Sequence, residues 1–285
     1  MTRTPLPPTT RRPRLARIAL VALATWAGVG VAACGSANRI NPEGIQDSAR
    51  RSYYEGMGEL VDGNYIAATQ LFQDVARSPR YVRFAALAKL RIGDALYLQD
   101  RYQEATELYR SFASQYKSDP NLPYARFQVA ACYYNRVPSE WFASPPAYEM
   151  DQSLTYQAEA ELKGFLDTFP TSRFAPRARS MLGEVRQMLF EAELFAADFY
   201  ERRDRWRAVA WRLDRAIDNY PELGLKEPLV WRMADAYARS GDEAQAAKAY
   251  GLYLKSFPEG EHKHEVKARM EKIRQRLDSD DHGRT

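Results

Sequence analysis

The sequence predicts an all-α solenoid of about five helical hairpins, closed by a C-terminal capping helix. Two observations lead to this fold class. From residue 48 onward, apolar residues recur with the period of an α-helix, and the alternating pattern of strands is absent. In addition, five segments resemble one another, and each has the pattern of the second helix of a hairpin. The 285 residues are 45% hydrophobic and 27% charged, which is an ordinary globular composition.

The five similar segments share a turn, a small residue and a spacing. They begin at Tyr65, Tyr102, Thr155, Trp206 and Glu243. Four of them follow a turn signal such as Asp62-Gly63-Asn64, and each has a small residue three positions after its first, where two helices must approach closely. Successive starts are 37, 53, 51 and 37 residues apart. Two of these spacings are close to the tetratricopeptide repeat (TPR) period of about 34 residues, so the sequence predicts a TPR-type α-solenoid.

Residues 1–33 have the features of a signal peptide. A basic stretch, residues 11–14, precedes an uncharged run, residues 18–33, that is shorter than the roughly 20 apolar residues needed to span a bilayer. The run ends in Val31-Ala32-Ala33, directly before Cys34. This arrangement resembles the lipobox of bacterial lipoproteins, in which the cysteine thiol receives a diacylglycerol and becomes the first residue. We therefore expect lipidation at Cys34 and a polar tether over residues 34–47.

The basic excess of the chain lies in this leader. Five of the 41 Lys and Arg residues fall within residues 1–33, which contain no Asp or Glu. Residues 34–285 therefore carry 36 cationic side chains against 37 Asp and Glu. Binding of nucleic acid needs a net cationic footprint, so no nucleic-acid partner is expected.

Two further elements explain the longer spacings in the middle of the chain. Residues 136–150 contain three prolines and form an expected loop that carries Trp141 and Phe142. A long helix from about Pro176 to Arg202 would extend about 40 Å. It would join an N-terminal group of three repeats (48–170) to a C-terminal group of two repeats and a capping helix (171–278). We expect the capping helix over residues 261–277 and a disordered tail over residues 279–285.

Several local motifs resemble the BamD family, the TPR lipoproteins of the outer-membrane β-barrel assembly (BAM) machinery. The resemblance runs from the lipobox to about Pro258. It includes Asp119-Pro120-Asn121-Leu122-Pro123-Tyr124-Ala125, the proline-containing aromatic insertion, Phe169-Pro170-Thr171-Ser172-Arg173-Phe174, and the stretch from Ala196-Ala197-Asp198-Phe199-Tyr200 to Asp218-Asn219-Tyr220-Pro221. The chain departs from the family at Asp204-Arg205, where Gly-Ala is usual, and in its long leader.

The resemblance implies a non-enzymatic assembly subunit on the periplasmic side of the outer membrane. Its partners would be the periplasmic POTRA domain of BamA, unfolded outer-membrane β-barrel proteins and other BAM lipoproteins. The family has an arginine on the second helix of repeat four at the BamA contact, and Arg212 matches that position. The alternative is a solvated arginine on a helix face.

The N-terminal repeats would bind the unfolded substrates. Candidate contacts are the aromatic residues Tyr53, Tyr54, Tyr97, Tyr133 and Tyr134 of the first helices, together with Trp141 and Phe142 of the insertion. The alternative for most of them is packing between helices, which is the usual role of aromatic residues in a helical solenoid.

No motif for enzymatic chemistry is recognisable, and no cofactor or metal is expected. His262 and His264 are two positions apart, so on a helix they point to different faces. Cys132 lies among small apolar residues and is expected to be buried rather than reactive. Two other roles stay open: a TPR scaffold lipoprotein of a pilus, secretin or cell-division envelope complex, and a cell-wall enzyme or its activator.

Overall fold

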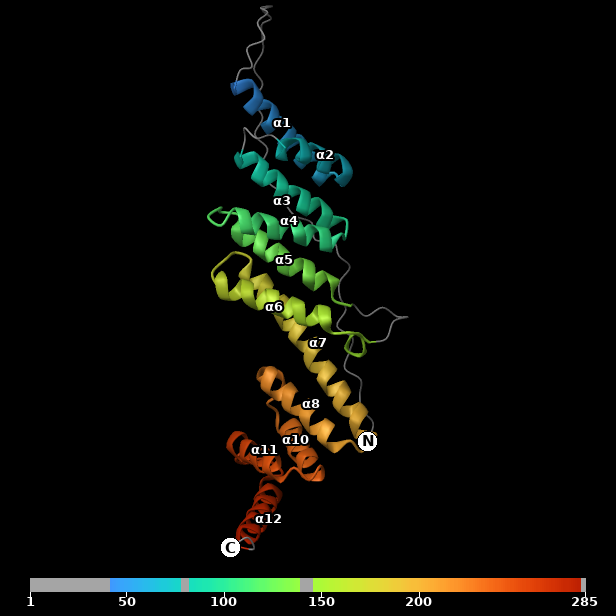
Figure 1. Cartoon of the computed structure of the whole chain (residues 1–285), viewed down its shortest axis with the longest axis vertical. Helices are drawn as coiled ribbons and strands as arrows, with labels where there is room; N and C mark the ends of the chain where they lie inside the picture. Colours follow the sequence, from blue (N-terminus) through green and yellow to red (C-terminus); the bar gives the residue numbers. More distant parts are fainter. Residues whose placement is uncertain (1–41, 78–81, 139–145, 283–285) are drawn as a thin grey trace, which may run out of the picture. The chain divides into compact units, whose positions relative to one another are not determined.

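The structure, a computed structural model, describes residues 42–77, 82–138 and 146–282. These residues fall within one unit, residues 41–285, and every regular element among them is a helix (Figure 1). The predicted fold class, a TPR-type α-solenoid, is confirmed. The five predicted second helices begin at Tyr65, Tyr102, Ser153, Trp206 and Glu243, so the predicted starts are met within two residues.

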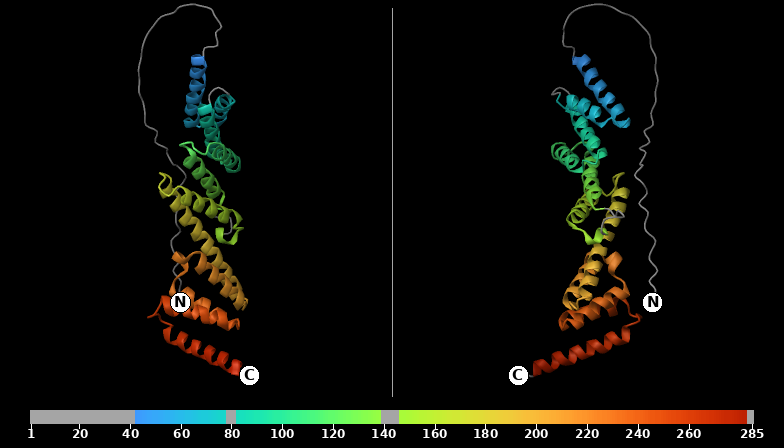
Figure 2. Two further views of the ribbon diagram at one scale, coloured as in Figure 1. Left: turned by 60° about the vertical axis from the view of Figure 1, so that its left-hand side comes forward. Right: turned by 90° about the vertical axis from the view of Figure 1, so that its right-hand side faces the viewer.

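Consecutive helices form five antiparallel hairpins that pack on one another. The hairpins are α1 (Pro42–Val61) with α2 (Tyr65–Ala76), α3 (Val82–Leu98) with α4 (Tyr102–Gln115), α5 (Leu122–Arg136) with α6 (Ser153–Thr168), α7 (Ala175–Glu201) with α8 (Trp206–Asn219), and α10 (Glu227–Arg239) with α11 (Glu243–Ser256). Each second helix also contacts the first helix of the following hairpin, and α11 contacts the last helix, α12 (Lys263–His282) (Figure 2). A short helix, α9 (Pro221–Gly224), follows α8.

Four hairpin turns share the same backbone conformation. Gly63, Asp100, Asp204 and Gly241 have positive φ angles of 84°, 59°, 54° and 78°, and each lies two residues before a second helix. In each turn the next N–H donates to a carbonyl five residues earlier, as Asn64 does to Glu59 and Arg205 does to Tyr200. This is the Schellman ending of a helix, which requires a left-handed residue at that position. Asp204 thus fills the position where glycine is usual, because aspartate tolerates this conformation better than most residues.

The predicted small residues lie at the closest approach of the helices. They are Ala68, Ala105, Ala158, Val209 and Ala246, and each is 0% exposed. A larger side chain at any of them would have to displace the partner helix, because protein interiors are packed without spare volume.

This packing gives a test of the repeat assignment. Replacing Ala105 with leucine is expected to lower the free energy of unfolding by about 1–3 kcal/mol, because it overfills the contact of α4 with α3. Replacing Glu107, which is exposed on the same helix, with leucine should change it by no more than about 0.5 kcal/mol. Urea unfolding of both variants measures the difference. Equal stabilities would show that Ala105 does not lie at a tight helix contact.

Apolar clusters are continuous from one repeat to the next. The cluster of repeat one shares Ile92 with that of repeat two, and the clusters of repeats two and three share Tyr97 and Tyr133. Leu194 of the long helix α7 belongs both to the cluster of repeat three and to the cluster of repeats four and five. The helix α7 has 27 residues and Pro176 in its first turn, as predicted, and it packs against α6 of repeat three and against α8 of its own hairpin.

The ends of the helical region differ from the expectation. Helix α1 begins at Pro42, six residues earlier than predicted, so residues 42–47 are helix and not tether. Proline suits the first turn because its missing N–H is not needed there. Helix α12 starts two residues later than predicted and runs to His282, beyond the expected end at 277. No glycine or proline occurs from residue 261 to 282 to stop it.

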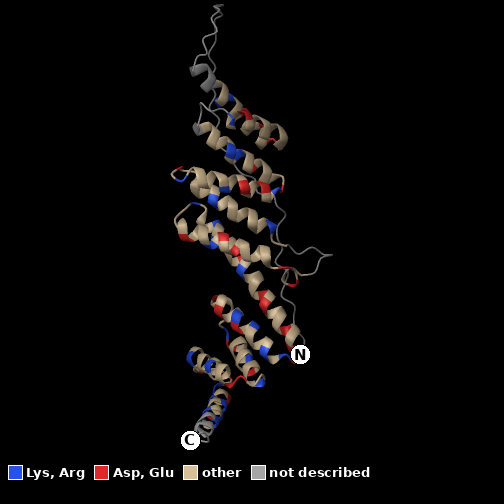
Figure 3. Cartoon of the chain, viewed as in Figure 1, with Lys and Arg blue, Asp and Glu red and all other residues tan. Residues whose placement is uncertain are grey.

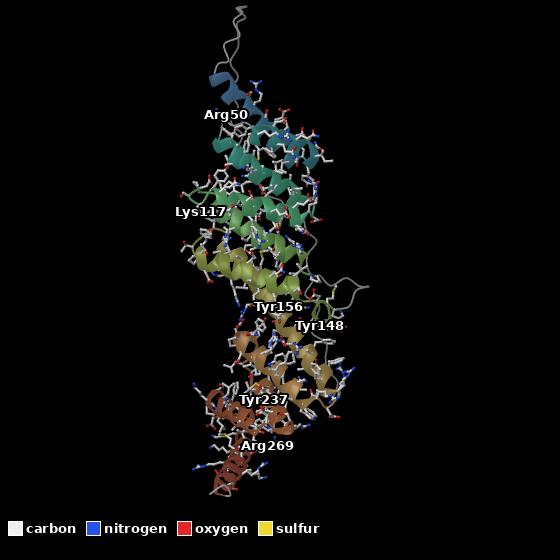
Figure 4. The ribbon with its side chains drawn as sticks, viewed as in Figure 1. Arg50, Lys117, Tyr148, Tyr156, Tyr237 and Arg269 are labelled. Carbon is white, nitrogen blue, oxygen red and sulfur yellow. The ribbon has the colours of Figure 1, made fainter. Side chains whose placement is uncertain are left out.

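The insertion between α5 and α6 departs from the helix, as its prolines predict. Helix α5 ends at Arg136, and the described part of the loop contains the short 3₁₀ helix η1 (Ala147–Glu149). The ring of Tyr148, which is labelled in Figure 4, packs on Phe195 of α7, with 5.3 Å between ring centroids. The loop is therefore fastened to α7 at this point. Trp141 and Phe142 lie outside the described residues.

Candidate partner-binding site

Arg212, the predicted partner contact, forms an ion pair within the protein. Its Nη1 atom lies 3.0 Å from Oε2 of Glu193 on α7, whose side chain is only 3% exposed. Arg215, one helical turn further along α8, places Nη2 3.0 Å from Oε1 of the same carboxylate. Two guanidinium groups therefore share one buried carboxylate.

A third helix reaches this carboxylate. The hydroxyl of Tyr156 on α6 (labelled in Figure 4) lies 3.4 Å from Oε1 of Glu193 and accepts a hydrogen bond from Nη2 of Arg215 at 3.3 Å. The cluster of Tyr156, Glu193, Arg212 and Arg215, hereafter the Glu193 cluster, connects α6, α7 and α8. It therefore links repeat three to repeat four through polar contacts.

The protonation states of the Glu193 cluster follow from burial and charge. Burial acts to lower the pKa of Arg212, but the hydrogen bond and the negative charge of Glu193 outweigh it, so this pKa is raised. Burial first, and then the charge of Glu193, raises the pKa of Tyr156. Arg212 therefore stays charged and Tyr156 stays neutral at physiological pH. A buried carboxylate is tolerated here because it is paired and hydrogen-bonded.

The solvent face beside the Glu193 cluster is aromatic. Trp211 is 54% exposed, and its indole has the guanidinium carbons of Arg212 and Arg215 at 5.4 and 5.3 Å from the ring centroid. Distances below about 6 Å allow a cation–π attraction. The sequence pointed to Arg212 alone, but this face also exposes the neighbouring indole of Trp211.

The aromatic residues proposed for substrate binding fall into two places. Tyr53 and Tyr54 lie on α1, where Tyr53 is 7% exposed and packed in the core of repeat one, whereas Tyr54 is 59% exposed. Tyr97, Tyr133 and Tyr134 are half-buried near the C-terminal ends of α3 and α5.

The second group is partly committed to contacts within the chain. Tyr97 accepts a hydrogen bond from Asn135, and the hydroxyl of Tyr134 donates to Glu184 on α7. The ring of Tyr133 has the guanidinium carbons of Arg110 and Arg136 at 5.2 and 5.6 Å from its centroid. Burial removes Tyr53 from a contact surface, because its ring is part of the core. The substrate role of the other four stays a prediction.

A second buried carboxylate, in repeat two, went unnoticed in the sequence. Asp94 on α3 is 7% exposed. Its Oδ1 accepts hydrogen bonds from the hydroxyls of Tyr109 at 2.6 Å and Tyr124 at 2.5 Å, and its Oδ2 accepts one from Arg91 at 2.5 Å. The Nε of Arg91 in turn donates to the hydroxyl of Tyr53 at 3.2 Å. These bonds tie together α1, α3, α4 and α5.

The buried cysteine gives a test of reactivity. Cys132 is 0% exposed, and burial raises the pKa of its thiol to about 12. At pH 8 only about one thiol in 10⁴ would be ionised, against roughly a quarter for an ordinary cysteine. We expect a disulfide reagent to label Cys132 on the order of 100 times more slowly in the native protein than in urea. Comparable rates would show that the thiol is accessible and reactive.

Side chains that bind metals are not clustered in the described residues. There, no group of three or more His, Cys, Asp or Glu side chains could hold a metal ion. His262 stacks on Trp231 of α10, with 4.1 Å between ring centroids and 8° between ring planes. In the same part of the chain, none of the helices is both apolar and long enough for a membrane span.

Comparison with known proteins places the chain in a family. Residues 45–252 match the family model YfiO, described as an outer membrane lipoprotein. The outer membrane protein assembly factor BamD of Caulobacter vibrioides is 25% identical over 206 residues, which are 72% of this chain and 65% of that protein. This chain therefore spans slightly less than two thirds of that relative.

Other relatives are covered more fully. BamD of Neisseria meningitidis serogroup A is 24% identical over 242 residues, covering 81% of this chain and 88% of the relative. Among solved structures, the TPR2AB domain of yeast Sti1 aligns with 81% of this chain at 11% identity and a TM-score of 0.42. The family model covers most of the chain, from α1 into α11. The chain therefore belongs to the YfiO family of outer membrane lipoproteins, which is the family of the BamD assembly factors.

Proposed function

We propose that this protein is a non-enzymatic lipoprotein subunit of the outer-membrane β-barrel assembly machinery. It is anchored through Cys34 in the periplasmic leaflet of the outer membrane. Its C-terminal repeats bind the periplasmic POTRA domain of BamA, and its N-terminal repeats bind unfolded β-barrel proteins. The observation that carries this proposal is the family match over residues 45–252, which includes the helices of all five repeats.

The face of α8 around Arg212 and Trp211 supports the BamA contact. It combines an exposed indole with two neighbouring arginines, and aromatic residues and arginine are enriched among the side chains that contribute most to protein interfaces. Figure 3 shows several basic residues along α8. A partner that presents carboxylates would match this face.

Recovery of BamA with the chain tests the proposal. A C-terminally tagged chain is expressed in its own bacterium, the envelope is solubilised in detergent, and the proteins recovered with the tag are identified. We expect BamA among them in comparable amount. Recovery of a pilus, secretin or cell-division complex without BamA would contradict the proposal and support the alternative scaffold role.

The role of Arg212 needs a substitution that the fold accepts. Changing Arg212 to glutamate would place a second carboxylate against Glu193, so lost binding could reflect damage to the fold. Arg212→Ala is preferable, with Arg110→Ala as the control, because Arg110 also forms an ion pair between helices, with Glu161. We expect BamA recovery to fall at least about fivefold for Arg212→Ala, about 1 kcal/mol, and to be unchanged for the control. Equal recovery would remove Arg212 from the interface.

A further inference from the structure

The outward face of α8 carries Arg207, Trp211 and Arg215 at spacings of four residues, so they align along one side of the helix. Arg207 and Trp211 are exposed. Arg207 has no ion pair among the described residues. Trp211 is not part of the described apolar cluster that packs α8 against α7 and α10, so this face of α8 is open to a partner.

The arginines beside the indole are fixed from below. Arg212 and Arg215 each reach back to Glu193, while their guanidinium carbons stay 5.4 and 5.3 Å from the centroid of Trp211. Arginine side chains lose about 2 kcal/mol of rotamer freedom when they are ordered. Here the buried carboxylate has ordered them before any partner arrives, which lowers the entropic cost of binding.

The balance of charge on this face is positive. Within four residues on either side of Trp211 there are three arginines and one acid, Asp214. Asp214 accepts a hydrogen bond from the hydroxyl of Tyr237 on α10 at 3.0 Å, so it is turned toward the neighbouring helix. Glu193 balances only one of the two arginines that it holds. A complementary surface therefore carries carboxylates.

We propose that Trp211 is the anchor of the partner interface, and that Glu193 is a positioning residue that holds Arg212 and Arg215 at the indole. The surface takes an apolar side chain of the partner on the indole and an adjacent carboxylate on the arginines. This inference rests on the proposed function, since it specifies how the C-terminal repeats hold their protein partner. It assigns the largest contribution to partner binding to Trp211 and not to Arg212.

Binding of the full chain to the purified periplasmic domain of BamA from the same bacterium tests the anchor. Trp211→Ala is expected to raise the dissociation constant about 30-fold, as for the loss of an interface hot spot. Tyr54→Ala is the matched control, because Tyr54 is 59% exposed and has Arg50 at 5.8 Å from its ring, but lies on α1. The control should bind within about twofold of the wild type. Binding of Trp211→Ala within the same limit would overturn the proposal.

Two milder variants test the positioning role. Glu193→Gln keeps the size of the side chain and removes its charge, and we expect binding about 10-fold weaker. Tyr156→Phe removes only the hydroxyl that reaches Arg215 and Glu193, and we expect a loss of about threefold. Glu159→Gln is the control, since Glu159 is also a nearly buried carboxylate on two cations, Arg186 and Lys163, but does not contact α8 arginines. Wild-type affinity for both Glu193→Gln and Tyr156→Phe would remove Glu193 from this role.

A measurement without a partner separates this inference from the proposed function. Acrylamide quenching of Trp211 is obtained as the difference between each protein and the same protein carrying Trp211→Phe. Glu193→Gln should increase this quenching and Glu159→Gln should not, because only Glu193 holds the arginines over the indole. If the wild type fails to bind BamA, the proposed function fails. Unchanged quenching in Glu193→Gln would instead reject the positioning role.

Discussion

Replacing Cys34 with alanine is expected to release the protein from the membrane almost completely. The proposed lipid on this cysteine carries several acyl chains, and each buried CH₂ group contributes about 0.8 kcal/mol to membrane binding. None of the described helices is long and apolar enough to span a bilayer. Fractionation of cells that express the variant measures the effect: the wild type should sediment with the membranes, and the processed variant should appear in the soluble fraction.

Cys132→Ala is the matched control for this experiment. It removes the other cysteine of the chain, which is buried in α5 and is not part of the lipobox. Membrane attachment should be unchanged. If Cys34→Ala is processed and still sediments with the membranes after a high-salt wash, the protein is held there by something other than a lipid at this position.

Replacing Asp94 with alanine is expected to cost about 3–5 kcal/mol of folding free energy. The variant leaves the guanidinium of Arg91 and the hydroxyls of Tyr109 and Tyr124 without their shared acceptor in the interior of repeats two and three. The negative charge of Asp94 raises the pKa of Arg91 against the opposing effect of burial. Because arginine is not deprotonated in proteins, the variant leaves a charged guanidinium without its partner.

Two comparisons make the Asp94 prediction specific. Tyr109→Phe removes one hydrogen bond to the same carboxylate and should cost about 1 kcal/mol. Asp62→Ala changes an exposed aspartate in the first turn and should cost no more than about 0.5 kcal/mol. Urea unfolding of the three variants gives the free energies. A loss of less than about 1 kcal/mol for Asp94→Ala would mean that the network does not hold these repeats together.

The repeat architecture could be predicted because local signals repeat along the chain. Gly63, Asp100, Asp204 and Gly241 each end a first helix in the left-handed conformation, and the sequence marks each with a turn signal. The small residues that follow lie at helix contacts for the same reason in every repeat. The ends of the helical region were less predictable. A polar stretch such as residues 42–47 can continue a helix that is stabilised by packing further along.

The candidate site was predictable only in part. Family resemblance pointed to Arg212, but a sequence pattern does not reveal that its guanidinium is paired with a residue 19 positions earlier. One signal was available. Glu193 lies four residues after the buried Leu189 and four before the buried Ala197, so it is an acid within the apolar stripe of a helix. Asp94 likewise follows the buried Leu90 by four residues. An acid in such a stripe indicates a buried polar cluster.

The sequence did not reveal which aromatic residues are buried and which are exposed. Tyr53 and Tyr54 are adjacent in the sequence, yet one is core and the other is surface, because neighbouring residues on a helix point about 100° apart. Trp211 was not among the residues that the sequence singled out. Its exposure depends on how α8 packs against α7 and α10, which no local pattern records.

Depletion of the protein in its own bacterium tests the central claim most directly. The quantity to measure is the folded, heat-modifiable fraction of β-barrel proteins in the outer membrane as the protein runs out. The proposed role in barrel assembly predicts that this fraction falls, that unfolded barrel proteins accumulate in the periplasm, and that the wild-type gene restores both. Barrel proteins that remain folded and abundant after depletion would contradict that role.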